Sequence, residues 1–180
     1  MPSTEQRVVN SRQVFAGRIL TLRVDTLAVP DGRTVEREVV EHRGAVAMVV
    51  LDDEGHVLLV RQYRPAVGEN LLEIPAGTIE ADEPPADCAR RELAEELGLA
   101  AGNWTRLAQC YSSPGFCTEL MHLYLAESLS PAFGQPDEDE AITVERVALA
   151  DIPSLITSGA IRDAKSIAGL MLALQRKGKE

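Results

Sequence analysis

The chain has 180 residues, of which 45% are apolar, and its formal net charge is −10. This length fits one domain, or one domain with a small additional section, and the apolar fraction is sufficient for a packed core. The negative charge disfavours a nucleic-acid partner, because phosphate backbones are bound by patches of Lys and Arg, and no apolar run is long enough to indicate a membrane partner.

The N-terminal section, residues 1–42, is predicted to form a small antiparallel sheet. Residues 12–29 are rich in apolar and β-branched side chains, and Pro30-Asp31-Gly32 is a strong turn signal. Residues 34–42 alternate loosely and are expected to form the return strand. The apolar side chains of this section indicate burial against a second copy of the chain, so we expect a homodimer; they are Ile19, Leu20, Leu22 and Val24.

The remainder, residues 43–180, is predicted to be mostly β with a few helices. Strand patterns occur at 45–51, 57–60, 71–76, 104–110, 120–126 and 142–148. A helix is expected before Gly98, a short one opens at 151–153, and a longer one covers 162–175. This order favours an α+β or mixed α/β sandwich.

Three glutamates share one face of the helix before Gly98. Glu92, Glu95 and Glu96 stand at positions i, i+3 and i+4. Like charges at this spacing repel by a few tenths of a kcal/mol per pair, so a cation is expected to bind beside this face. Mg²⁺ and Mn²⁺ prefer carboxylate oxygens and often bridge to substrate phosphates. A solvated acidic face is the alternative for an isolated Glu-x-x-Glu-Glu pattern.

The residues around the three glutamates fit a helix that presents metal ligands along one edge and packing groups along the next. Pro84 and Pro85 are expected to begin the helix and Gly98 to end it. An apolar stripe beside the acidic face is expected to anchor the helix; it consists of Ala86, Leu93 and Leu97.

The whole run resembles the Nudix box, the signature of hydrolases that split a diphosphate linked to another group. It comprises Gly77, Glu83 and the continuous stretch 91–99. The resemblance implies an α/β/α sandwich with a mixed sheet, in which the N-terminal section is a dimer-forming sheet. It also implies a division of labour within the box. Metal would be bound by Glu92, Glu95, Glu96 and the backbone carbonyl of Ala76, and the loop and helix would be held together mainly by Arg91 and Glu83, in a frame that includes Gly77 and Gly98.

A second stretch resembles the ADP-ribose pyrophosphatase branch of this family. Pro114 lies 15 residues beyond Leu99, and residues 61–64, 73–77 and 161–166 also look like that branch. Ser113-Pro114-Gly115 is by itself only a turn. Because this turn stands at the family's distance from the box, the resemblance implies a substrate site that includes Arg61, Arg64, Pro114, Gly115 and Glu119.

The two arginines have an independent physical reason to bind phosphate. A guanidinium group matches a phosphate with two parallel hydrogen bonds, and the chain is otherwise acidic. The alternative for Arg61 and Arg64 is a solvated strand end.

The acidic run 137–140 is either a solvated turn or part of the catalytic machinery. In the branch named above, an acidic loop after the box supplies the residue that orients or deprotonates the attacking water. The resemblance therefore implies Glu138 and Glu140 as catalytic candidates beside Glu95 and Glu96, with Glu119 as a weaker one.

The expected function is Mg²⁺- or Mn²⁺-dependent hydrolysis of ADP-ribose to AMP and ribose 5-phosphate. One alternative is the same chemistry on another nucleoside diphosphate sugar, such as ADP-glucose or GDP-mannose. Another is a nucleotide sensor without turnover, which the intact set of box carboxylates disfavours. The three cysteines form no Cys-x-x-Cys pair, so a reducing cytoplasm is the expected location.

Overall fold

The computed structural model describes residues 6–134 and 142–179. The chain forms two compact units, residues 1–44 with 111–120 and residues 45–110 with 121–180. The first unit therefore contains the segment around Pro114 in addition to the N-terminal section. None of the helices within the described ranges has the length and apolarity needed to cross a membrane.

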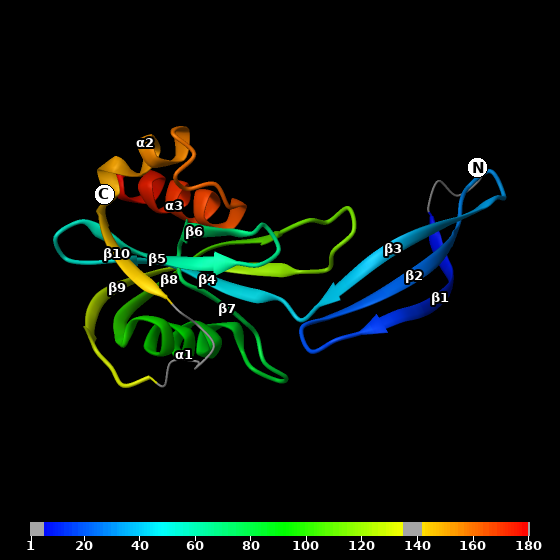
Figure 1. Ribbon diagram of the computed structural model, residues 1–180, viewed down its shortest axis with the longest axis horizontal. Helices are drawn as coiled ribbons and strands as arrows, with labels where there is room; N and C mark the ends of the chain where they lie inside the picture. The colour runs from blue at the N-terminus through cyan, green and yellow to red at the C-terminus, as the bar shows by residue number, and fades with distance from the viewer. Residues whose placement is uncertain (1–5, 135–141, 180) are drawn as a thin grey trace. The chain divides into compact units, whose positions relative to one another are not determined.

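The first unit is built on a three-stranded antiparallel sheet, which confirms the predicted N-terminal sheet (Figure 1). Its strands are β1 (Arg7–Ala16), β2 (Leu20–Ala28) and β3 (Thr34–His42), in that order. The turn between β2 and β3 is closed by the Gly32 amide, which donates to the Val29 carbonyl at 2.9 Å. Gly32 has a φ of +87°, a conformation that favours glycine.

Residues 111–120 are hydrogen-bonded to β3 within this unit. The Val40 amide donates to the Phe116 carbonyl at 2.7 Å, and the Thr118 amide donates to the Val40 carbonyl at 2.9 Å. The Thr118 hydroxyl in turn accepts from the His42 amide at 2.9 Å. The turn around Pro114 is thus fixed to a strand far away in sequence.

The described residues of the second unit form a seven-stranded mixed sheet and three α-helices. Its elements are β4 (Ala45–Leu51), β5 (His56–Arg64), β6 (Glu69–Glu73), β7 (Ala76–Thr78), α1 (Pro85–Leu97), β8 (Leu99–Tyr111), β9 (Leu120–Pro131), β10 (Thr143–Ala148), a 3₁₀ turn (Leu149–Asp151), α2 (Ile152–Thr157) and α3 (Ala164–Lys177). The central order of the sheet is β10-β5-β4-β9-β8. Strands β4 and β9 pair in parallel, whereas β5 pairs antiparallel with β4, β6 and β10.

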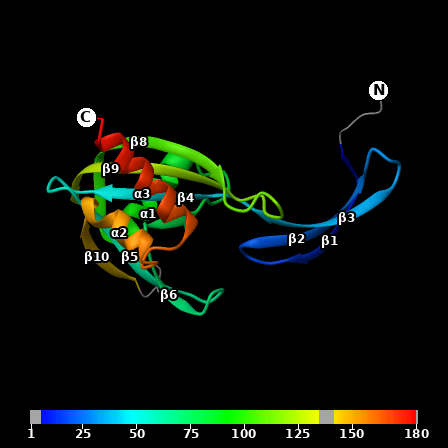
Figure 2. The same cartoon turned by 90° about the horizontal axis from the view of Figure 1, so that it is seen from above.

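Strand β4 lies between two hydrophobic cores, because its side chains alternate between the two faces of the sheet. Ala47 and Val49 belong to the core that includes Leu170 of α3, whereas Met48 belongs to the core that includes Leu93 of α1. All seven residues of β4 are buried. Figure 1 shows α1 on one side of the sheet and α2 and α3 on the other, and Figure 2 shows α3 lying across the central strands. This confirms the predicted α/β/α sandwich.

One predicted strand is wrong. Residues 71–76 are not a single strand but the end of β6 and the start of β7, and these pair with different neighbours, β5 and β4. The break falls at Ile74-Pro75, because proline has no amide hydrogen with which to continue a ladder. The Pro75 carbonyl instead accepts from the Met48 amide at 2.9 Å. The chain thereby passes from one pairing partner to the next just before Gly77.

Candidate active site

Helix α1 carries the three glutamates and begins and ends where the sequence predicts. Pro85 occupies its first turn, and Gly98 ends it in a left-handed conformation with φ 65° and ψ 31°. The Gly98 amide donates to the Ala94 carbonyl at 3.0 Å, which satisfies one of the last free carbonyls of the helix.

The buried face of α1 differs in part from the predicted stripe. Cys88, Ala89 and Leu93 are fully buried, and Leu97 packs against the same core. Ala86, which the sequence places in the stripe, is exposed. It shares the angular position of Leu93 but lies in the first turn, and angular position alone does not tell which turns a neighbouring element covers.

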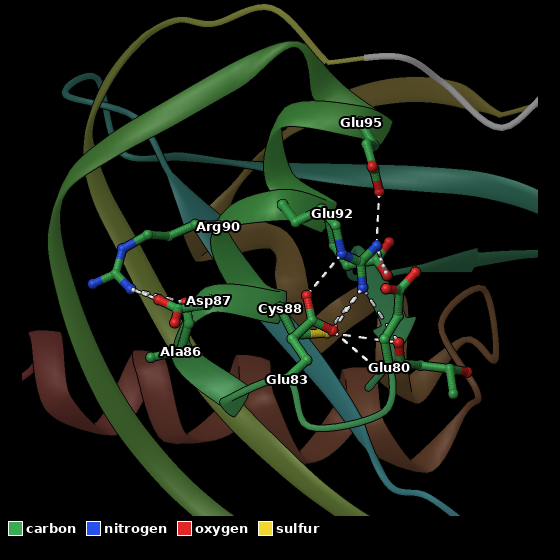
Figure 3. A network of polar contacts seen from close by, with 10 residues as sticks. Glu80, Glu83, Ala86, Asp87, Cys88, Arg90, Glu92 and Glu95 are labelled. Atoms are coloured by element: carbon green, nitrogen blue, oxygen red, sulfur yellow. Dashed lines mark hydrogen bonds and ion pairs between the residues drawn. The ribbon is translucent and has the colours of Figure 1, made fainter.

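Arg91 joins the helix to the loop before it. Its Nε donates to Glu83 Oε1 at 2.8 Å, and its Nη2 donates to Glu83 Oε2 at 3.0 Å, the bidentate geometry of a strong charge-assisted pair (Figure 3). Glu83 Oε2 also accepts from the Glu80 amide at 3.0 Å. The Arg91 guanidinium holds the pKa of Glu83 at about 2, well below its ordinary value of 4.5.

This depressed pKa predicts a defined pH dependence of stability. Since the folded-state pKa of Glu83 lies below its unfolded-state value, its contribution to the free energy of unfolding is present above about pH 4.5 and is lost as the pH falls toward 2. We expect Glu83→Gln to lower the free energy of unfolding by about 1–3 kcal/mol near neutral pH, and the difference from the native chain to shrink below about pH 4. Urea unfolding of both proteins across this range, with Glu80→Gln as the exposed control on the same loop, measures it. A difference independent of pH would contradict the Glu83 assignment.

The same guanidinium contacts two of the three helix glutamates. Arg91 Nη1 donates to Glu92 Oε1 and to Glu95 Oε2, each at 2.8 Å (Figure 3). Among residues 6–134 and 142–179, no three His, Cys, Asp or Glu side chains are arranged to hold a metal ion. Glu92 and Glu95 each direct one carboxylate oxygen to Arg91 Nη1, so an ion held by both would share these carboxylates with the guanidinium.

Gly77 places strand β7 directly against the Glu92 side chain. A Cβ atom at position 77 would overlap the Glu92 carboxyl group, so no larger residue fits without displacing it. Ala76, the residue before it, is paired with Ala47 of β4. The carboxylate of Glu92 therefore lies beside the segment whose carbonyl is the fourth predicted ligand. A set of carboxylate and carbonyl oxygens with no sulfur or imidazole fits a hard divalent ion.

Both predicted substrate arginines lie on β5 and are ion-paired. Arg64 Nη2 donates to Glu73 Oε2 at 2.6 Å, and Arg61 Nε donates to Glu145 Oε1 at 2.6 Å. Their side chains are 35% and 42% exposed, so both remain accessible from solvent. Their role toward phosphate stays a prediction.

The other predicted site residues are placed as follows. Pro114, Gly115 and Glu119 belong to the first unit, where the Glu119 carboxylate lies 3.7 Å from His42 Nδ1 and the Glu119 carbonyl accepts from the Ser112 amide at 3.2 Å. Glu138 and Glu140 lie outside the described residues. Their roles also stay predictions.

Sequence reasoning gave no individual role to two residues of the second unit, Glu73 and Lys165. Glu73 is buried and pairs with both Arg64 and Lys165. The available signal was the single charged residue within the apolar stretch 71–74, because a carboxylate buried among apolar residues needs a cation nearby.

Comparison with known proteins finds two matching domain families and several similar proteins. The model of the NUDIX domain matches residues 41–170, and that of the nucleoside diphosphate sugar hydrolase N-terminal domain matches residues 7–40. The chain is 39% identical over 168 residues to an ADP-ribose pyrophosphatase of Bacillus subtilis (strain 168), covering 92% of this chain and 91% of the relative. It is 37% identical over 142 residues to a GDP-mannose pyrophosphatase of Citrobacter koseri, covering 73% and 74%. A crystal structure of an ADP compounds hydrolase superposes with a TM-score of 0.87 at 26% identity, covering 97% and 96%.

Proposed function

The chain belongs to the Nudix hydrolase family, and from this premise we propose that it hydrolyses the diphosphate of ADP-ribose to AMP and ribose 5-phosphate with Mg²⁺ or Mn²⁺. The observation that carries the proposal is the arrangement around Arg91, which gathers Glu83, Glu92 and Glu95 beside the Ala76-Gly77 strand. The near full-length similarity to the Bacillus subtilis relative, named for ADP-ribose, supports the substrate.

The box residues would hold the divalent ion. Its ligands would be the carboxylates of Glu92, Glu95 and Glu96 and the carbonyl of Ala76. When bound, the ion neutralises charge on the diphosphate and lowers the pKa of a bound water.

The remaining residues act on the diphosphate and the attacking water. Arg61 and Arg64 donate hydrogen bonds to phosphate oxygens and hold the diphosphate in line for attack. Glu138 or Glu140 orients the water and accepts a proton from it while the water oxygen attacks a phosphorus atom. Glu119 is the weaker candidate for that step. The bridging P–O bond breaks, leaving AMP and ribose 5-phosphate.

The second candidate substrate is GDP-mannose, favoured by the similarity to the Citrobacter koseri relative. The relatives named for GDP-mannose are 33–37% identical to this chain, against 39% for the ADP-ribose pyrophosphatase, so ADP-ribose is the first choice. A sensor without turnover is disfavoured because all three helix glutamates are retained.

We also propose a homodimer through the first unit and a cytoplasmic location. The three-stranded sheet and the turn after β1 expose several large apolar side chains, a pattern typical of an association surface; they are Val8, Val9, Val14, Phe15, Ile19 and Leu20. The three cysteines are free, which fits a reducing compartment. Light scattering of the purified chain tests the dimer.

The activity is tested by incubating the chain with ADP-ribose and excess Mg²⁺, and in parallel with a chelator. We expect AMP and ribose 5-phosphate in equal amounts with metal and no turnover with chelator. Tight, metal-independent binding of ADP-ribose without products would support the sensor instead.

Substitution of Gly77 tests the contact between β7 and Glu92. We expect Gly77→Ala to lower kcat by roughly 10- to 100-fold, because the added Cβ displaces the Glu92 carboxylate. The displaced group is the end of a flexible side chain, so the melting temperature should fall by only a few degrees. Gly178→Ala, where φ is −73° and the nearest atom to an added Cβ is the Leu174 carbonyl oxygen at 3.5 Å, is the matched control for the added methyl group. Native kcat in Gly77→Ala would show that the position of Glu92 is unimportant.

A further inference from the structure

Glu73 is a charged residue in the interior of the second unit. Its side chain is 2% exposed, at the end of β6. Burying a carboxylate costs several kcal/mol unless cations and hydrogen bonds compensate. Here two cations do so, because Arg64 Nη2 lies 2.6 Å and Lys165 Nζ lies 2.7 Å from Glu73 Oε2. An apolar residue at this position would have a smaller desolvation penalty, so the presence of the charge indicates a role in fixing a particular geometry.

The backbone that follows Glu73 is held at each step until it reaches the box. The Ile74 amide donates to the buried Ser166 hydroxyl at 2.8 Å. The Ile74 side chain packs so closely on Gly169 that a Cβ there would lie 2.9 Å from Ile74 Cδ1. The Pro75 carbonyl accepts from Met48 of β4. The next residue is Ala76, so the position of its carbonyl depends on the contacts of the three residues before it as well as on its own pairing with Ala47.

Most of these contacts come from the start of α3, which contributes none of the predicted metal ligands. Asp163 caps this helix by accepting from the Ser166 amide at 3.0 Å, and its Oδ1 also accepts from Lys165 Nζ at 2.8 Å. Helix α3 packs on the face of the sheet opposite α1. The segment that enters the box is therefore held from the side of the sheet away from the box glutamates.

The same carboxylate orients Arg64. Glu73 accepts from Arg64 Nε at 3.0 Å as well as from Nη2, which fixes the plane of the guanidinium. Lys165 shares Oε2 with this arginine and is only 15% exposed. Loss of the lysine would leave Arg64 as the only cation that these contacts provide for Glu73, so the guanidinium would be less free to bind a phosphate.

We propose that Lys165, acting through Glu73, is a positioning residue for the Ala76 carbonyl and the Arg64 guanidinium. The inference rests on the function proposed above, in which the first binds metal and the second binds phosphate. It gives the start of α3 a role in metal affinity and substrate affinity in addition to its role in packing.

The test compares Lys165→Met with Lys165→Arg, which restores a cation. We expect Lys165→Met to weaken Mn²⁺ binding, measured without substrate by electron paramagnetic resonance, by roughly tenfold. We also expect KM for ADP-ribose to rise by a similar factor while kcat at saturating metal changes less than about threefold. Lys165→Arg should recover most of both losses. Lys177→Met, which removes a lysine near the other end of α3 that pairs with Glu127, is the matched control and should keep native Mn²⁺ affinity and KM.

A second variant keeps the test valid if Lys165→Met does not fold. Glu73→Gln/Lys165→Met removes both charges, so no buried carboxylate is left short of a cation, and it should show the same weaker Mn²⁺ binding and higher KM. Folded variants with native Mn²⁺ affinity and native KM would overturn the proposal. Failure of the proposed function is distinguishable, because it would appear in the native chain as absent Mn²⁺ binding or absent turnover of ADP-ribose.

Discussion

Replacement of Glu96 by Gln is expected to lower kcat for ADP-ribose by roughly 10³-fold, which corresponds to about 4 kcal/mol of transition-state stabilisation. The amide keeps the size of the side chain but removes the negative charge that a divalent ion requires. Because Glu96 is only partly buried and is not part of the apolar core that α1 contributes, the melting temperature should change by no more than a few degrees. Initial rates at saturating Mg²⁺, together with a thermal melt, measure both quantities.

The control for Glu96→Gln is Asp87→Asn on the same helix. Asp87 is 64% exposed and pairs with Arg90. Its replacement by Asn removes one negative charge from α1, as Glu96→Gln does, but leaves the box residues unchanged. We expect its kcat to remain within about twofold of the native value. Equal activity of Glu96→Gln and the native chain would remove Glu96 from the metal site, whatever the behaviour of the control.

Replacement of Arg91 by Met is expected to lower the free energy of unfolding by about 2–4 kcal/mol near neutral pH, the largest stability effect that we predict for one substitution. Three carboxylates lose their shared cation at once, and that of Glu83 is only 14% exposed. The pKa of Glu83 should rise when the guanidinium is removed, so the deficit should narrow as the pH falls below about 4.5. Urea unfolding at several pH values measures both effects.

The neighbouring Arg90 provides the matched control for Arg91→Met. Arg90 pairs with the exposed Asp87 and lies 6.0 Å from the ring of Trp104. Arg90→Met should therefore cost less than about 1 kcal/mol. Similar losses for the two variants would mean that the network around Arg91 contributes no more than an ordinary surface pair.

The helix of the box was predictable because local spacing determines it. Glu92, Glu95 and Glu96 must share a face in any α-helix, and Gly98 can adopt the left-handed conformation that ends one. The break at Ile74-Pro75 was less visible, because the surrounding residues are apolar enough for one strand. A proline within such a run is the signal that should have divided it.

The cation that pairs with Glu73 and the exposure of Ala86 were not predictable from local pattern. Both depend on which distant element covers them: α3 brings Lys165 to Glu73 from 92 residues away, whereas Ala86 stays exposed in the first turn of its helix. The close approach of Gly77 to Glu92 was likewise not visible in the local pattern, although Gly77 itself was identified as part of the box.

The most direct test of the account is a competition between substrates. ADP-ribose, ADP-glucose and GDP-mannose are mixed at equal concentrations with Mg²⁺ and the native chain, and the loss of each is followed by chromatography, so that relative rates give relative kcat/KM. We predict that ADP-ribose is consumed at least roughly tenfold faster than either competitor, with AMP and ribose 5-phosphate formed in equal amounts. Faster loss of GDP-mannose would contradict the substrate assigned here, and no loss of any of the three would contradict the hydrolysis itself.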